Sequence, residues 1–394
     1  MKSSLYNLEK LLSFRRDLHK HAEGSFNEFR TSAKIIEYLL ELGIKEDQIR
    51  KVASTGLVVD IKGTAPPSGK PYCIAIRADM DALPIKEQNP EIDYASITDY
   101  AHMCGHDTHV TCLLGGAAKV LEKLDQIPSD KCLRLLFQPA EEDEGGAFPM
   151  LQEGVMEGVD EVYGMHNWPF DLPGKVYVKP GYMMACITHI DIKIHGKGGK
   201  ASQLEGVIDP IQPAIDIQKG LKEIVQEFKD KGYYFTVSLP LIRGSDDPEF
   251  VADTCNLGGY LRAFDVECIV GIKKRIQDLV ESSCRNYNCK VDCFMQTTYP
   301  AVNNTEKETE NFIKIAKKVV GEENVVDTHL PVLGAEDFSF FQKAAPGVFF
   351  FCSSSRKPTD VLHTNCFNPH DDYIPIACEI HYRVVENRFG LEFK

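Results

Sequence analysis

Regularly spaced apolar residues divide the chain into predicted helices and strands. Apolar residues recur at helical spacing in LEKLLSFRRDLHKH (8–21) and in FRTSAKIIEYLLELG (29–43), where Gly43 provides a stop signal. Short apolar runs follow in GLVVDI, YCIAIRA, CLRLLF and VDEVYGM, separated by helical or turn-rich stretches. Because strands alternate with helices, the pattern predicts an α/β sheet that is covered on both faces.

The middle of the chain has a different pattern. From about residue 186, ITHIDIKI alternates like a half-buried strand, and 210–228 carries apolar residues at helical period. YYFTVSLPLIR, CNLGGYLRAF, a helix over 266–286 and CKVDCFMQT follow in that order. The order strand, helix, strand, strand, helix, strand is typical of a ferredoxin-like unit. After TYPAVNN the α/β pattern resumes with KETENFIKIAKKVV, GVFFFCSS and a C-terminal helix.

Chain length supports a division into two domains. At 394 residues the chain exceeds the size at which a single core usually stops growing. We therefore predict a main α/β domain made of 1–185 and 299–394, interrupted by an inserted ferredoxin-like α+β domain over 186–298.

Composition excludes several classes of partner. The formal net charge of -14, without a dense stripe of lysine and arginine, opposes binding to nucleic acid. No apolar run reaches the roughly 18 residues that a membrane span needs. The 13 cysteines lack the regular spacing of a disulfide scaffold and are expected to be reduced, which fits the cytoplasm.

Candidate chemistry gathers in the segment His102-Met103-Cys104-Gly105-His106-Asp107-Thr108-His109. Thiolate and imidazole suit zinc or a similar cation. If the backbone is extended here, Cys104 and His106 point the same way, and Gly105 allows a ligand to approach closely. The structural alternative is a buried cysteine beside ordinary loop histidines.

Further acids and histidines follow other predicted strands. CLRLLFQPA leads into four consecutive acids, Glu141 to Glu144, which would repel one another unless they are solvated or neutralised. In an extended backbone, one glutamate can hold a cation while its neighbour faces water as a general base. His166 follows VDEVYGM, and His363 comes after GVFFFCSS. A core histidine and a solvated acidic turn are the structural alternatives, but strand ends that meet at one sheet edge favour a metal site.

The strand YCIAIRA runs into two more acids, Asp79 and Asp81. Carboxylates in such positions can orient metal-binding histidines. Turn or cap residues are the structural alternative, which for Asp79 is about as well supported.

Together these motifs resemble a known family. RADMDALP, HMCGHDTH, FQPAEED, GMHN, KPGYMMA, HGKGG, YPAVN, GAEDF and LHT occur in family order along nearly the whole chain. The chain resembles the amidohydrolase branch of the dinuclear-metal aminoacylase and carboxypeptidase superfamily, which includes hippurate hydrolases, N-acyl-amino-acid amidohydrolases and auxin-conjugate hydrolases. The resemblance implies a zinc-peptidase-like catalytic domain with an inserted ferredoxin-like lid that can mediate homodimers.

The resemblance also assigns roles to individual residues. It implies that two divalent cations, which can be zinc, manganese or nickel, are held by Cys104, His106, Glu142, His166 and His363. Glu141 would then be the general base and Asp81 an orienting acid.

The lid departs from the family pattern. The histidine that usually follows GKGG is Lys200 here, and a Pro-His pair a few residues on is Leu204-Glu205. The usual Asn-Val-Ile-Pro-Asp stretch begins with Glu249, whereas Arg262 is retained. We predict that Lys200 donates to the reacting oxygen and that Arg262 and Glu249 line the substrate site. A solvated loop residue is the alternative for Lys200.

The main hypothesis is therefore hydrolysis of the amide bond in a small N-acylated amino acid. A dipeptidase or carboxypeptidase needs the same metal site and differs in what its pocket accepts. A relative that binds metal without turnover is the third hypothesis, motivated by the altered lid.

Overall fold

The computed structural model describes residues 4–143 and 145–392 and divides them into two units. Unit 1 is made of Met1–Met183, Asn303–Leu330 and Asp337–Lys394. Unit 2 is made of Met184–Val302 and Pro331–Glu336. The short segment 331–336 was expected in the main domain, but hydrogen bonds attach it to unit 2. The Ala185 N–H donates to the Gly334 carbonyl at 2.7 Å, and Arg262 donates to the Leu333 carbonyl at 3.2 Å.

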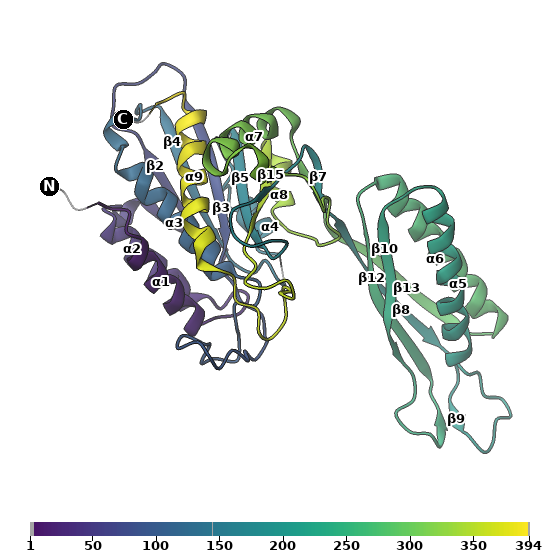
Figure 1. The fold of residues 1–394 in the computed structure, drawn as a ribbon. Helices are drawn as coiled ribbons and strands as arrows, with labels where there is room; N and C mark the ends of the chain where they lie inside the picture. Colours follow the sequence, from purple (N-terminus) through teal and green to yellow (C-terminus); the bar gives the residue numbers. More distant parts are fainter. Residues whose placement is uncertain (1–3, 144, 393–394) are drawn as a thin grey trace. The chain divides into compact units, whose positions relative to one another are not determined.

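Unit 1 is built on an eight-stranded mixed sheet (Figure 1). In spatial order the strands are β1 (Ile49–Val52), β2 (Gly56–Lys62), β4 (Lys131–Gln138), β3 (Tyr72–Asp79), β5 (Glu161–Trp168), β16 (Gly347–Ser353), β6 (Val176–Tyr177) and β15 (Val325–Val326). The four central strands β4, β3, β5 and β16 run parallel. Their near-continuous burial is the pattern of a parallel strand that is covered on both faces.

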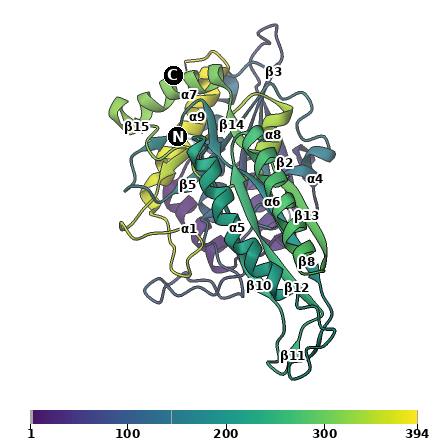
Figure 2. The ribbon, with the colours of Figure 1, turned by 90° about the vertical axis from the view of Figure 1, so that its right-hand side faces the viewer.

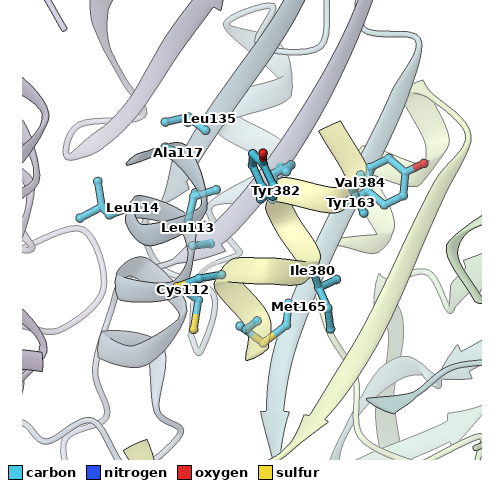
Figure 3. Packing of buried hydrophobic residues seen from close by; sticks show 14 of the residues in the cluster. Cys112, Leu113, Leu114, Ala117, Leu135, Tyr163, Met165, Ile380, Tyr382 and Val384 are labelled. Carbon is cyan, nitrogen blue, oxygen red and sulfur yellow. The ribbon is translucent and has the colours of Figure 1, made fainter. Parts of the chain in front are cut away.

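Helices cover this sheet and bury its largest hydrophobic core. The helices are α1 (Leu8–Lys20), α2 (Phe29–Glu41), α3 (His106–Leu121), α4 (Ala147–Gln152), α7 (Glu306–Val320), α8 (Ser339–Ala344) and α9 (Ile374–Arg388). Helix α3 lies beside α9 (Figure 1). Side chains from these two helices pack with side chains from the central strands, as Figure 3 shows for Leu113, Leu135, Met165 and Ile380. The helices predicted from 8–21 and 29–43 are confirmed.

Alternation along β5 determines which side chains face away from this core. Tyr163 and Met165 join the core cluster that includes α3 and α9. Successive side chains of a strand point to opposite faces, so His166 and Trp168 point the other way. Because β4, β3 and β5 are parallel, the residues that follow them gather at one sheet edge.

Unit 2 has the predicted ferredoxin-like order. Its sheet runs β10 (Phe235–Arg243), β12 (Thr254–Ala263), β8 (Cys186–His195) and β13 (Lys290–Tyr299), all antiparallel. Helices α5 (Ile211–Asp230) and α6 (Val266–Asn286) lie side by side over one face (Figure 2). Ile190, Ile192 and Ile194 alternate into the core beneath them. The fold class predicted from the sequence is confirmed.

Four short strands complete the fold. They are β7 (Gly181–Met184), β9 (Gly199–Lys200), β11 (Phe250–Val251) and β14 (Val302–Asn304). β7 pairs with β14, and β9 pairs with β11. Among the described residues, each helix is too short or too polar to cross a membrane.

Candidate metal centre

Glu141 and Glu142 lie in a turn just after β4, and two buried acids hold that turn. Ala140 has a left-handed φ of 52°, and Glu141 and Glu142 lie in a turn, so the backbone here is not extended as was predicted. Asp81 accepts hydrogen bonds from the backbone N–H groups of Glu141 and Glu142 at 3.0 and 3.1 Å. Glu28 accepts one from the Ala140 N–H at 2.9 Å. The orientation of both glutamates therefore depends on acids far away in the sequence.

Cys104 and His106 lie on either side of a left-handed glycine, and the expected extended backbone is wrong here too. Gly105 has a φ of 90°, and His106 is the first residue of α3. A Cβ atom on Gly105 would lie 2.4 Å from Nδ2 of Asn167. Glycine is thus required both by conformation and by close packing.

His363 was expected at the end of a strand, but it reaches the site on a loop. It lies beyond the end of β16, with a left-handed φ of 62°. Its backbone N–H donates to the Met103 carbonyl at 2.8 Å, which fixes the loop beside Cys104. The imidazole is about half exposed, at 51%.

The five predicted metal ligands converge from four separate segments. Cys104 Sγ lies 3.3 Å from Nε2 of His166 and 3.3 Å from Nε2 of His363. Glu142 Oε1 lies 3.2 Å from Nε2 of His363 and 3.7 Å from Nε2 of His106. Glu141 joins His106 and Glu142 in a group whose possible ligand atoms all lie within 4.8 Å of one another.

Hydrogen bonds to one ring nitrogen leave the other available in two of the histidines. His106 Nδ1 lies 3.3 Å from Asp81 Oδ1, and His166 Nδ1 is bonded to the Asn167 carbonyl. An acceptor at Nδ1 places the proton there and leaves the Nε2 lone pair free to bind a cation. Asp81 therefore acts on His106 as well as on both glutamates.

Burial and the surrounding carboxylates shift the pKa values of two predicted ligands, His106 and Cys104. Burial lowers the pKa of His106, but Asp79 and Asp81 outweigh it and raise that pKa to about 10. These acids therefore favour positive charge at the ring, and a divalent cation at Nε2 would replace the proton there. Burial raises the pKa of the Cys104 thiol well above its ordinary value, and the Glu142 and Glu141 carboxylates raise it further. A thiolate at this place therefore requires compensating positive charge.

A second group of hydrogen-bonded residues, of which Asp79 alone was predicted, lies beside His166, and the rings of His109 and His166 are 4.5 Å apart. His109 Nδ1 donates to Asp79 at 2.5 Å, and its Nε2 accepts from the Asn167 backbone N–H at 2.9 Å. Asp79 also pairs with Arg77 at 2.6 Å. Both nitrogens of His109 are engaged by Asp79 and Asn167, so it positions these two neighbours. Its possible ligand atom also lies within 4.8 Å of those of Asp79, His106 and His166. The sequence signal that could have identified His109 was its position three residues after His106, within the first turn of α3.

The donor set fits divalent cations. Within the described part of the chain, His106 Nε2 and Glu142 Oε1 are buried without a hydrogen-bond partner. Buried polar atoms without a hydrogen bond are costly, and a cation would satisfy both. One thiolate, three imidazoles and a carboxylate match the ligand preferences of zinc and similar metals.

The remaining predicted site residues belong to unit 2. Lys200 is exposed on β9 and pairs with Phe250 on β11. The Glu249 carbonyl accepts from the Ala201 N–H at 2.8 Å, so Glu249 and Lys200 lie close together. Arg262 lies on β12, and burial lowers its pKa.

Comparison with known proteins identifies relatives over most of the chain. Residues 75–387 match the model of "Peptidase family M20/M25/M40". Thermostable carboxypeptidase 1 of Saccharolobus solfataricus is 36% identical over 90% of this chain and 88% of its own length. N-acetylcysteine deacetylase of Bacillus subtilis is 32% identical over 94% of each chain. The Bacillus subtilis YXEP protein, described as a dinuclear metal binding peptidase, superposes with a TM-score of 0.80 at 29% identity, covering 98% of this chain and 99% of that one.

Proposed function

The chain belongs to peptidase family M20/M25/M40, a family of metal-dependent amidohydrolases and peptidases, and from this we propose that it cleaves the amide bond of N-acylated amino acids. One observation carries the proposal. Cys104 contacts His166 and His363, Glu142 contacts His106 and His363, and Glu141 lies in one group with His106 and Glu142. A site that only stored metal would have no use for the additional buried carboxylate of Glu141.

In this reaction the cations would activate the substrate carbonyl and water, and Glu141 would transfer the proton. Divalent cations, when bound, polarise a carbonyl and make water more acidic. Glu141 takes a proton from water as the water oxygen attacks the amide carbon. The same carboxyl then returns this proton to the amide nitrogen as the carbon–nitrogen bond breaks. The products are a carboxylic acid and a free amino acid.

Asp81 is the positioning residue in this scheme. It accepts from the backbone of Glu141 and Glu142, and it contacts His106. Burial raises its pKa, but contact with His106 outweighs that effect and keeps the pKa below its ordinary value. The carboxylate therefore stays ionised and can accept all three contacts.

The two glutamates provide the decisive experiment. Glu141→Gln should retain the cations and lose about 100-fold or more in kcat, the scale of general base catalysis. Glu142→Gln should lose metal as well, because it removes a ligand charge. Asp143→Asn, an exposed neighbour, is the matched control. Elemental analysis and hydrolysis of N-acetyl, N-benzoyl and dipeptide substrates would measure both effects, and reversed phenotypes would show that the assignment of the pair is swapped.

Carboxypeptidase activity is the second candidate. It is favoured by the relative with that name, which is 36% identical. Both reactions break an amide bond next to a free amino acid carboxylate, so the same cations and base would serve. The substrate panel above distinguishes them by the ratio of N-acyl to dipeptide hydrolysis.

Unit 2 would supply substrate contacts and a dimer interface. We propose that Lys200 replaces the family histidine as a donor to the reacting oxygen, and that Arg262 and Glu249 contact the substrate. Val266 and Val270, one turn apart on α6 and 72% and 61% exposed, support a homodimer through this unit. A cytoplasmic location agrees with 13 free cysteines.

A further inference from the structure

A run of aromatic rings leads away from His166. The ring centroids of His166 and Trp168 are 5.6 Å apart, and those of Trp168 and Phe170 are also 5.6 Å apart. Phe170 in turn lies 5.0 Å from His329, at an interplanar angle of 31°. The run starts at a proposed metal ligand and ends at an exposed side chain.

Buried rings form a floor beneath this run. Trp168 packs on Phe351 at 4.5 Å, and Phe170 packs on Tyr177 at 4.9 Å. Phe351 and Tyr177 are fully buried, whereas Trp168 and Phe170 are only half-buried. Two large rings thus keep part of their apolar surface in water, although burial would stabilise the fold. Apolar surface that remains exposed beside a reactive site marks a place for apolar ligand atoms.

The backbone under these rings is fixed. Trp168 ends β5, and its carbonyl accepts from the Ser354 N–H at 3.1 Å. Asp171, which follows Phe170, is bonded to the Tyr177 hydroxyl and pairs with Lys175 at 2.9 Å. The rings are therefore held in place before any ligand binds, which reduces the entropy lost on binding.

We propose that Trp168 and Phe170 form the subsite for the acyl group and select aromatic or long apolar acyl groups over acetyl. This inference rests on the proposed amidohydrolase function. A substrate carbonyl held beside His166 places the acyl chain within a few bonds of Trp168. The amino acid half of the substrate carries a carboxylate, which needs a cation, and Lys175 is already paired with Asp171. The apolar surface of Trp168 and Phe170 therefore suits the acyl group, which is the uncharged half of the substrate.

The single tryptophan allows a direct binding test in the wild-type, metal-loaded protein. Trp168 is the only tryptophan, so all tryptophan fluorescence reports on this subsite. Phenylacetate, the acid released from an aromatic N-acyl amino acid, should change the emission saturably, and acetate should not. Equal responses to both acids, or no response to phenylacetate, would overturn the subsite. Because free acids need no turnover, saturable phenylacetate binding without hydrolysis of any substrate would reject the proposed function and retain the subsite.

Kinetics give the second test. The ratio of kcat/KM for N-phenylacetyl to N-acetyl derivatives of one amino acid should fall about 10-fold in Trp168→Leu and in Phe170→Leu. Phe148→Leu, a 49% exposed phenylalanine on α4, should leave that ratio unchanged. An unchanged ratio in both subsite variants, or a change in amino acid preference instead, would refute the assignment. Where Trp168→Leu lost metal or secondary structure, Phe170→Leu and the fluorescence titration would decide.

Discussion

Glu28 should make the stability of this protein depend on pH, and Glu28→Gln should remove that dependence. Burial raises the pKa of Glu28 from 4.5 to about 7; the Thr55 hydrogen bond opposes this and Asp81 adds to it. Its side chain is fully buried and accepts hydrogen bonds from Thr55 Oγ1 at 2.5 Å and from the Ala140 N–H at 2.9 Å. A protonated Glu28 can keep both contacts by donating to the Thr55 hydroxyl.

The sign follows from proton binding. A folded-state pKa that is raised above the unfolded value means that the folded protein binds the proton more tightly. The stabilising contribution is then fully present below pH 4.5 and is lost as the pH rises to about 7. At about 1.36 kcal/mol per pKa unit, roughly 2 to 3 kcal/mol should be lost between about pH 5 and pH 8.

Glutamine has the hydrogen-bonding pattern of the protonated acid, so Glu28→Gln should not show this loss. We expect denaturant unfolding of metal-saturated protein at the two pH values to give a smaller decrease in unfolding free energy for Glu28→Gln than for the wild type. Other titrating groups affect both proteins alike and cancel in the difference. Glu37→Gln, an exposed acid on α2, should behave like the wild type. Parallel decreases in wild type and Glu28→Gln would show that Glu28 is ionised in the folded state.

Three further predictions concern the site. Cys104→Ala and His106→Ala should each lower metal content together with activity, and full occupancy in both, measured by elemental analysis, would remove this segment from the site. Gly105→Ala should also lose metal, because its left-handed φ and the contact with Asn167 exclude a Cβ atom; a variant with wild-type metal affinity and activity would contradict this. Lys200→Ala should reduce kcat and kcat/KM together with metal retained, by a factor on the order of 100 if a full oxyanion donor is lost. Wild-type kinetics would instead assign Lys200 to a solvated loop.

The sequence by itself determined the elements and their order. Helical spacing in 8–21 and 29–43 gave α1 and α2, and short apolar runs gave β2, β3, β4 and β5. The order of elements in 186–298 was enough to predict a ferredoxin-like sheet, which the pairing β10-β12-β8-β13 confirms. These features are readable because burial imposes a period of about 2.0 or 3.6 residues on a local stretch of chain.

The residues of the metal site could also be predicted from the sequence, but the extended backbone predicted around them was wrong. Cys104 and His106 are separated by a left-handed glycine, and Glu141 follows a left-handed Ala140. No periodic pattern predicts such conformations, because they are stabilised by particular neighbours such as Asn167 and Asp81.

Only the tertiary structure decided how the site is assembled. His363 contacts Cys104 from 259 residues away, and Glu28 holds the Ala140 N–H from 112 residues away. His109 was visible as a histidine, yet only its hydrogen bonds to Asp79 and Asn167 show that it positions other residues of the site. Such roles depend on which atoms occupy each hydrogen-bonding position after the sheet and helices have packed, and pairs this distant leave no local signal in one chain.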